Sequence, residues 1–189
     1  MELLLERDTI RFYIDRTFDI KYLSPIQSYV QWKLESNNWD DYNELYHASR
    51  LIEQLKTHSD IWFDTHVLLK DNSIIGVLLI VGGKIRKLEK KYEIENEDQS
   101  LLLKYFHIID KEHGYGSIWL NDVILLYYRQ KNFSQIYVNS SHKLSFPFYE
   151  RLGWSIAKYE QQSDNNLFRR EGSCFLIDIG NKDAVAYPV

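Results

Sequence analysis

Two glycines one residue apart, Gly114 and Gly116, stand between an apolar segment and a stretch that is expected to be helical. The start of a helix presents main-chain N–H groups that the helix does not use, and glycine lets a ligand come close to the backbone. The segment KEHGYG (111–116), followed by Ser117, therefore has the composition of a short pyrophosphate-binding loop. On these residues alone, a simple tight turn is the favoured interpretation.

The glycine pair completes neither of two common nucleotide-binding motifs. A dinucleotide-binding G-x-G-x-x-G motif needs a third glycine, and a Walker loop needs Gly-Lys followed by Ser or Thr. The sequence after Gly116 provides neither. The remaining phosphate-binding interpretation is a short loop that binds through main-chain donors. Lys111 enters this loop, Gly114 and Gly116 open its backbone, and Ser117 starts the helix.

A second stretch that could do chemistry lies about thirty residues further along, in NSSHKLSFPFYERLGW (139–154). It places Tyr149 on a short expected helix over 143–153, and Gly153 is expected to end that helix in a left-handed conformation. A tyrosine in this place can supply a phenolic proton to a reaction. It can equally pack against the helix with its hydroxyl bonded locally.

The elements that must position these residues follow from the hydrophobic pattern. Helices are expected over 24–38, with Ser24 as N-cap and Pro25 at the first helical position, and over 39–58. An antiparallel hairpin is expected from 62–71 and 73–85, with the second strand buried on both faces. The remaining expected elements are strands near 10–20, 101–109, 134–140, 154–162 and 172–180, and a helix over 117–130.

Length, composition and charge narrow the class of protein. A chain of 189 residues with 44% apolar residues is expected to fold as one domain over 1–189. The net charge of −4 and the mixed charge pattern provide no basic face for nucleic acid or an anionic membrane. The most basic run, 84–98, turns acidic within a few residues and is expected to be a solvated connection. Cys174 is the only cysteine, and the first residues lack the pattern of a signal peptide, so a cytoplasmic protein is expected.

The loop 111–116 and the segment FYERLGW (148–154) together resemble the GNAT superfamily of N-acetyltransferases, over about residues 66–155. The resemblance implies an α/β (α+β) fold with a GNAT-like mixed, mostly antiparallel central sheet and helices on both faces. It implies acetyl-CoA as the acyl donor, a cofactor-binding core over 66–155 and a variable substrate-side region over 1–60. The expected acceptor is a small-molecule amine or a peptide amine, and a homodimer is left open.

The resemblance also implies roles for individual residues. Acyl transfer would be direct: the amine attacks the thioester, N–H groups of the strand 101–109 polarise the carbonyl, and Tyr149 returns a proton to the thiolate. His142 stands where the family commonly has Asn, and Ser145 where it commonly has Ala. The expected cofactor contacts are His107, Ile108, Ile109, Lys111, Glu112, His113, Gly114, Tyr115, Gly116, Ser117, His142 and Ser145.

The general base and the acceptor site are less defined. His107 is the first candidate for the base because its pKa lies near the working range, and Asp110, Asp64 and His66 are alternatives. Segments 37–47 and 60–66 combine aromatic and acidic residues that suit an ammonium-bearing substrate, although Trp39 and Tyr46 packing on the sheet would also explain the first segment. Cys174 is expected to be a buried apolar residue.

Two other classes of function stay open at this point. A protein of the same fold that binds acyl-CoA without catalysis, as a sensor or scaffold, would carry the same cofactor residues. In a protein-interaction domain without a nucleotide site, these residues would not form a cofactor-binding site.

Overall fold

The computed structural model describes residues 1–39, 42–109, 114–163 and 166–180. Its central feature is one eight-stranded sheet with the order β1-β2-β3-β4-β5-β6-β8-β7. Among the described strands, β5 and β6 form the parallel pair and all other neighbours run antiparallel. The strands are β1 (Glu2–Arg7), β2 (Ile10–Asp15), β3 (Ile61–Lys70), β4 (Ser73–Gly83), β5 (Ser100–Ile108), β6 (Gln135–Ser140), β7 (Trp154–Gln162) and β8 (Arg169–Asp178).

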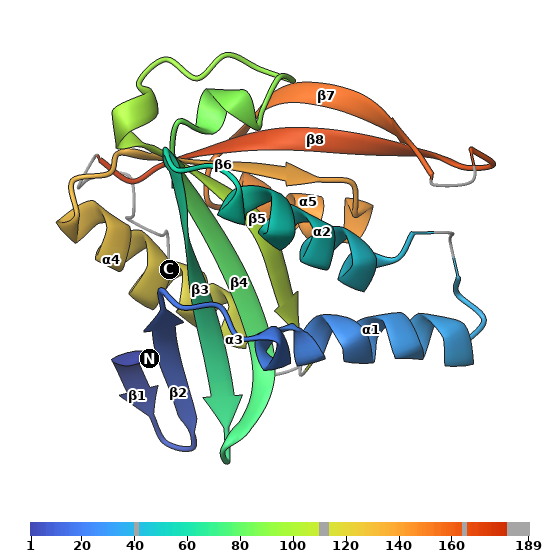
Figure 1. Cartoon of the computed structure of the whole chain (residues 1–189), viewed down its shortest axis with the longest axis horizontal. Coiled ribbons are helices and arrows are strands. Elements are labelled where there is room, and N and C mark those ends of the chain that lie inside the picture. The colour runs from blue at the N-terminus through green and yellow to red at the C-terminus, as the bar shows by residue number, and fades with distance from the viewer. Residues whose placement is uncertain (40–41, 110–113, 164–165, 181–189) are drawn as a thin grey trace.

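Helices cover both faces of the sheet, as expected from the sequence (Figure 1). Helices α1 (Ser24–Glu35) and α2 (Glu44–Lys56) lie on one face. Helices α3 (Tyr115–Ile118), α4 (Leu125–Gln130) and α5 (Phe146–Glu150) lie on the other. Short 3₁₀ turns occupy Ile20–Leu23, Ile85–Lys87, Glu97–Gln99 and Lys143–Ser145.

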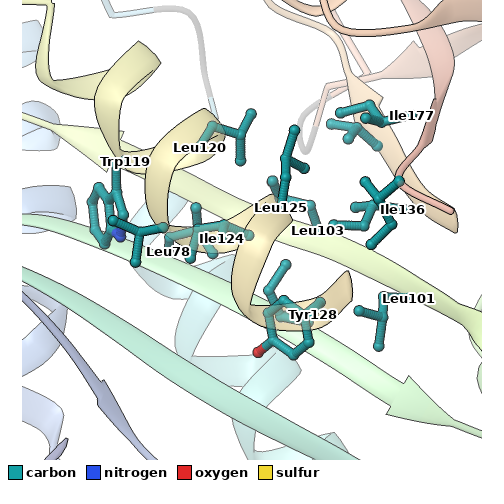
Figure 2. Packing of buried hydrophobic residues seen from close by; sticks show 14 of the residues in the cluster. Leu78, Leu101, Leu103, Trp119, Leu120, Ile124, Leu125, Tyr128, Ile136 and Ile177 are labelled. Atoms are coloured by element: carbon teal, nitrogen blue, oxygen red, sulfur yellow. The ribbon is translucent and has the colours of Figure 1, made fainter. Parts of the chain in front are cut away.

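Each face of the sheet has its own hydrophobic core. Under α3, α4 and α5, buried side chains from the helices interlock with those of the central strands, as Figure 2 shows for Trp119, Leu120, Ile124 and Tyr128. Under α1 and α2, Ala48, Ile52 and Leu55 pack on the opposite side of the sheet, which confirms the helical spacing expected for that segment. Because β4 contributes to both cores, its uninterrupted apolar run is explained by burial on two faces.

Several local expectations at the N-terminal side are corrected by the structure. Strand β1 was not expected, and it pairs with β2 at the edge of the sheet. The N-cap of α1 is Leu23 and not Ser24, because a 3₁₀ turn runs directly into the helix and leaves no extended residue to cap it. Helix α2 begins at Glu44, since the Asn43 side chain accepts a hydrogen bond from the Tyr46 N–H and caps the helix there.

Gly153 does not adopt the left-handed conformation that the sequence suggested, since its φ is not positive. The reason for glycine is close packing against β8. A Cβ atom at this position would lie 2.0 Å from the main-chain oxygen of Leu176. Gly153 therefore marks a contact between the end of α5 and the sheet.

The helical segment after Gly114 contains a wide turn that the sequence periodicity did not predict. A π-helical stretch, Trp119–Ile124, joins α3 to α4, and the Leu125 N–H donates to the Leu120 carbonyl five residues earlier. The extra residue in this turn lets Leu120 and Leu125 both face the sheet. Among the described residues, no helix is long and apolar enough to span a membrane.

Candidate active site

A cleft opens where the two parallel strands separate. Pairing between β5 and β6 runs from Ser100 and Gln135 to Leu103 and Val138, and it stops there although both strands continue. A bulge in β5 lies at the same level, because Leu79 pairs with Tyr105 while Ile80 pairs with Leu103. Lys104 is the extra residue of this bulge. Bulges of this kind bend a strand and redirect side chains, often beside functional sites.

A cavity of about 1120 Å³ occupies the cleft. Its walls come from five parts of the fold: α1 with the start of α2, the end of β5, the end of β6 with the turn that follows it, α5, and the β7–β8 hairpin. Its volume exceeds what a small amine alone requires and suits an extended ligand with a second molecule beside it.

The edge of β5 that faces the cleft carries main-chain groups. The Ile109 N–H donates to the Ile75 carbonyl at 2.8 Å, so Ile109 directs its main chain toward β4. Since successive residues of a strand direct these groups to opposite sides, Phe106 and Ile108 direct theirs toward the separated β6. Ile108 and Ile109 both line the cavity, but only Ile108 presents its N–H to it.

Tyr149 lines the cavity from α5 and is only 6% exposed. Its ring packs against Phe148 and Phe175, with centroids 5.3 and 5.4 Å away. Among the described residues, none forms a hydrogen bond with the Tyr149 hydroxyl. Burial raises the pKa of the phenol, which keeps its proton in place at neutral pH.

His107 also lines the cavity, from β5. Its ring lies 5.6 Å from the ring of Tyr29 on α1 and 6.3 Å from that of Tyr105. His107 therefore stands between the strand edge and the α1 wall, on the side of the sheet that the first sixty residues cover.

The turn after β6 brings His142 and Ser145 to the cavity wall. The Ser145 hydroxyl donates to the His142 carbonyl at 2.8 Å and lies 2.8 Å from the Ser140 hydroxyl. The Ser140 hydroxyl in turn accepts the His142 N–H at 3.2 Å. These bonds hold the turn that leads into α5 and so fix the approach to Tyr149.

The residues expected to bind the pyrophosphate have mixed outcomes. Lys111, Glu112 and His113 lie outside the described residues. Gly114 caps α3 with a left-handed φ of +67°, and the space around it is open, since a Cβ there would meet nothing within 4 Å. A Cβ at Gly116 would make only ordinary contacts, of 3.5 Å or more. Gly114, Tyr115, Gly116 and Ser117 are not among the cavity-lining residues, so the structure leaves them beside the cavity and not in its wall.

Two candidates for the general base are placed away from the cavity. Tyr128 donates to Asp64 at 2.9 Å and lies 2.8 Å from His66 Nε2, in a buried network below α4. Because the single Tyr128 proton goes to Asp64, His66 Nε2 carries the proton in its own bond with Tyr128. Burial lowers the pKa of His66 to about 3. Asp64 and His66 are therefore structural, and Asp110 lies outside the described residues.

The two segments expected to recognise an ammonium group differ in outcome. From 37–47, Tyr42 and Glu44 line the cavity, while Trp39 and Tyr46 are exposed and do not pack on the sheet. Glu44 is already paired with the buried Lys33 at 2.8 Å. From 60–66, no residue lines the cavity.

Sequence reasoning missed three residues at the floor of the cleft. Lys104 and Asn139 line the cavity, and Glu89 contacts both of them from the connection between β4 and β5. The segment 84–98 was expected to be solvated, but the Glu89 side chain is only 1% exposed. Cys174 is buried as expected, on β8 opposite Asn139. No pattern in the sequence links these distant positions, because the β5 bulge and the strand separation bring them together.

Comparison with known proteins gives matches of structure. No protein-family model and no curated protein sequence matches the chain. A protein from Desulfovibrio desulfuricans assigned to the GNAT family of acetyltransferases matches with a TM-score of 0.56 at 13% identity, over 90% of this chain and 99% of the other. An acetyltransferase from Salmonella typhimurium that modifies the N-terminal serine of ribosomal protein L7/L12 matches with a TM-score of 0.58 at 12% identity, over 94% and 99%.

A third match comes from a protein solved with its ligand. YncA from Salmonella typhimurium, assigned as an acetyltransferase and solved with acetyl-CoA, has a TM-score of 0.55 at 10% identity, over 94% of this chain and 98% of the other. At identities this low, the matches establish a shared fold over nearly the whole of both chains.

Proposed function

We propose that this chain, which has the GNAT fold, is an acyltransferase that moves the acetyl group of acetyl-CoA to a primary amine. The observation that carries the proposal is the cleft between β5 and β6, which holds a free strand edge and the Tyr149 hydroxyl in one cavity. A fold alone does not determine chemistry, so the proposal depends on these groups and not on the match.

The cleft suits the donor for a chemical reason. The arm of coenzyme A carries amides that need hydrogen-bond partners along an extended path, and the cleft edge of β5 offers main-chain groups at Phe106 and Ile108. The start of the helix at Gly114 lies beyond that edge, where Tyr115 and Gly116 contribute the first main-chain N–H groups of the helix. The proposed pyrophosphate contacts are therefore at this end, together with Lys111, Glu112, His113 and Ser117.

In the proposed reaction, the amine nitrogen of the acceptor attacks the carbonyl carbon of the thioester. A C–N bond forms, the C–S bond breaks, and the N–H groups on the β5 edge stabilise the negative charge that develops on the carbonyl oxygen. Tyr149 gives its proton to the departing sulfur and is later reprotonated from solvent. Burial raises the pKa of the phenol, so Tyr149 carries its proton before each turnover.

His107 is the proposed base that deprotonates the acceptor's ammonium group, so that the neutral amine can attack. A second N–H proton leaves to solvent as the amide forms. Of the three described candidates for this role, His107, Asp64 and His66, His107 is the one that lines the cavity, which supports the proposal. Its position beside Tyr29 puts it on the α1 side, where an acceptor would enter.

The proposed acceptor is a small-molecule amine or a peptide amine. The Salmonella protein that modifies the N-terminal serine of L7/L12 shows that this fold accommodates a protein N-terminus. The same proposal keeps a single domain over 1–189, a cytoplasmic location and a homodimer as expectations from the sequence, to be tested by gel filtration and fractionation.

A thermal unfolding experiment with acetyl-CoA tests the first step. A ligand present at 100 times its Kd stabilises a folded protein by about 2.7 kcal/mol, which for a chain of this size raises the midpoint by several degrees. Stabilisation by acetyl-CoA and by CoA is expected. No shift at millimolar concentration would contradict the proposal and the acyl-CoA sensor alternative alike, whereas binding without acetyl transfer to any amine would favour the sensor.

A further inference from the structure

The floor of the cleft carries a positive charge that the proposed reaction does not use. Lys104 is the bulged residue of β5, and the bulge directs its side chain into the space between β5 and β6. The side chain is 18% exposed, and burial is the main cause that lowers the pKa of its ammonium group. Its ionic partner is Glu89, with Lys104 Nζ 3.7 Å from Glu89 Oε2. That separation is well beyond the 2.7–2.9 Å of a charge-assisted hydrogen bond.

Glu89 is held mainly by other groups. Its Oε1 accepts the main-chain N–H groups of Lys90 and Lys91 at 3.0 and 2.9 Å and lies 3.4 Å from Lys91 Nζ. Its Oε2 accepts a hydrogen bond from Asn139 Nδ2. Although burial opposes ionisation, the Lys91 N–H and the charges of Lys104 and Lys91 hold the pKa of Glu89 below its usual value. Glu89 is therefore a fixed anion whose hydrogen bonds are already made.

Asn139 adds an acceptor to the same floor. Its amide nitrogen is committed to Glu89, which fixes the orientation of the side chain. Its Oδ1 is buried and has no hydrogen-bond partner among the described residues, although Asn139 lines the cavity. A buried carbonyl oxygen without a donor is unfavourable, and a ligand with an N–H group would relieve this.

The charges at the floor do not balance. Glu89 contributes one negative charge, while Lys104 and Lys91 contribute one positive charge each. Of the other charged side chains of the cavity wall, Lys143 pairs with Glu171 at 2.6 Å and Glu44 pairs with Lys33 at 2.8 Å. Arg169 lies 3.8 Å from Glu160, and the Arg170 guanidinium lies 4.6 Å from the centre of the Tyr42 ring. A buried ammonium group that is incompletely paired is costly, and an anion bound beside it would reduce that cost.

We infer that the acceptor is an amine that carries a carboxylate, as an amino acid does, with Lys104 binding the carboxylate and Asn139 Oδ1 accepting an N–H of the amine. The inference rests on the proposed acetyl transfer and names the acceptor class of the same cavity. Lys104 and Asn139 both lie against Oε2 of Glu89, and a zwitterion of this kind offers an anionic group for Lys104 and an N–H group for Asn139. Tyr29 and Trp32 line the α1 wall of the cavity, and their stacked rings are 5.9 Å apart. This wall suits an apolar or aromatic side chain on the acceptor.

The test compares matched acceptors with and without the carboxylate. Acetyl transfer is measured with L-phenylalanine and L-phenylalaninamide, and with L-methionine and L-methioninamide, using wild type, Lys104→Met, Lys104→Arg and a control, Lys158→Met. Lys158 lies exposed on β7, outside the cavity wall. Lys104→Met is expected to lower the acid-to-amide ratio of kcat/KM roughly tenfold or more. Lys104→Arg is expected to keep most of the preference, and Lys158→Met all of it.

A second measurement needs only the wild-type chain. In the presence of CoA, N-acetyl-L-phenylalanine is expected to bind about tenfold more tightly than N-acetyl-L-phenylalaninamide, by calorimetry. Equal binding of the two, or binding of neither at millimolar concentration, would overturn the inference. An equal fall of kcat/KM for the acids and the amides in Lys104→Met would also overturn it, because Lys104 would then act in the reaction itself. A chain that binds acetyl-CoA and acetylates amines without regard to the carboxylate refutes this inference alone, whereas a chain that does not bind acetyl-CoA refutes the proposed function and this inference with it.

Discussion

Leu103 of β5 and Val138 of β6 are the last paired residues of the parallel strands, and the cleft begins directly beyond them. The next residue of β5, Lys104, forms the bulge, and the next residue of β6 is Asn139. One break in pairing therefore exposes a strand edge, opens a cavity and places two polar side chains at its floor.

Removing the Tyr149 hydroxyl is expected to impair chemistry and spare binding. Tyr149→Phe keeps the ring packed against Phe148 and Phe175, so the fold and the affinity for acetyl-CoA should stay close to wild type. Loss of a general acid typically lowers turnover 10²- to 10⁴-fold, and a fall of about that size in kcat is expected. Tyr46→Phe, on the exposed face of α2, is the matched control. Unchanged turnover in Tyr149→Phe would show that another group protonates the thiolate.

Gly114 is expected to be needed for its backbone conformation. At a φ of +67°, a β-branched residue is strained, so Gly114→Val should shift the start of α3 and weaken acetyl-CoA binding at least tenfold while the sheet stays folded. Gly114→Asn is the control, since Asn tolerates left-handed backbone and the surrounding space is open. Calorimetric titration with acetyl-CoA measures both. Normal binding by Gly114→Val would reduce this loop to a simple turn.

Gly153 is expected to matter for stability. A Cβ placed 2.0 Å from the Leu176 oxygen forces α5 and β8 apart, and overpacking of this kind costs about 1–3 kcal/mol. Gly153→Ala should therefore lower the melting temperature by several degrees. Gly116→Ala, where the added atom meets nothing closer than 3.5 Å, should melt near wild type. Equal melting temperatures would mean that the end of α5 is not packed as described.

His66 is expected to make the fold sensitive to acid. Burial lowers the pKa of His66 to about 3, while an imidazole in the unfolded chain titrates near 6.5. Between these values the unfolded state binds one proton more than the folded state, so the free energy of unfolding falls as the pH falls. The contribution of this residue is up to about 1.4 kcal/mol per pH unit.

His66→Gln keeps a donor for Tyr128 and removes the titrating group. Urea unfolding between pH 4 and pH 7 should then show a shallower loss of stability than in wild type. Asp64, whose pKa burial raises, is present in both proteins. Parallel curves for the two proteins would indicate that His66 is protonated in the folded state.

Much of the fold could be predicted from the sequence. The period of the apolar residues indicates which face of a helix or strand is buried, and turn residues indicate where a strand ends. The β3–β4 hairpin follows from two apolar runs around Asp71 and Asn72, both of which have the positive φ of a tight turn. Helix α2 follows from apolar residues three and four positions apart. The sequence did not predict the edge strand β1, because most of its residues are exposed. It did not predict the π-helical turn, because that turn departs from the 3.6-residue period of an α-helix.

Residues of the candidate site could be predicted from the sequence only where they belong to a local motif. Tyr149 belongs to such a motif, and the structure places it in the cavity. Lys104, Glu89 and Asn139 come from three separate segments, and nothing in the sequence shows that a bulge and a parting of strands bring them together. Asp64 and His66 are alternatives to His107 as the base in the sequence, and their burial below α4 is a property of the tertiary structure that the sequence does not show.

The most direct test of the central claim is release of free CoA from acetyl-CoA by the purified chain, followed with a thiol reagent across a panel of amines. We predict release that depends on both the enzyme and the amine, with the acetylated amine recovered in equal amount and with amino acids among the best acceptors. CoA release that no amine accelerates, from a chain that is folded and binds acetyl-CoA, would contradict the account.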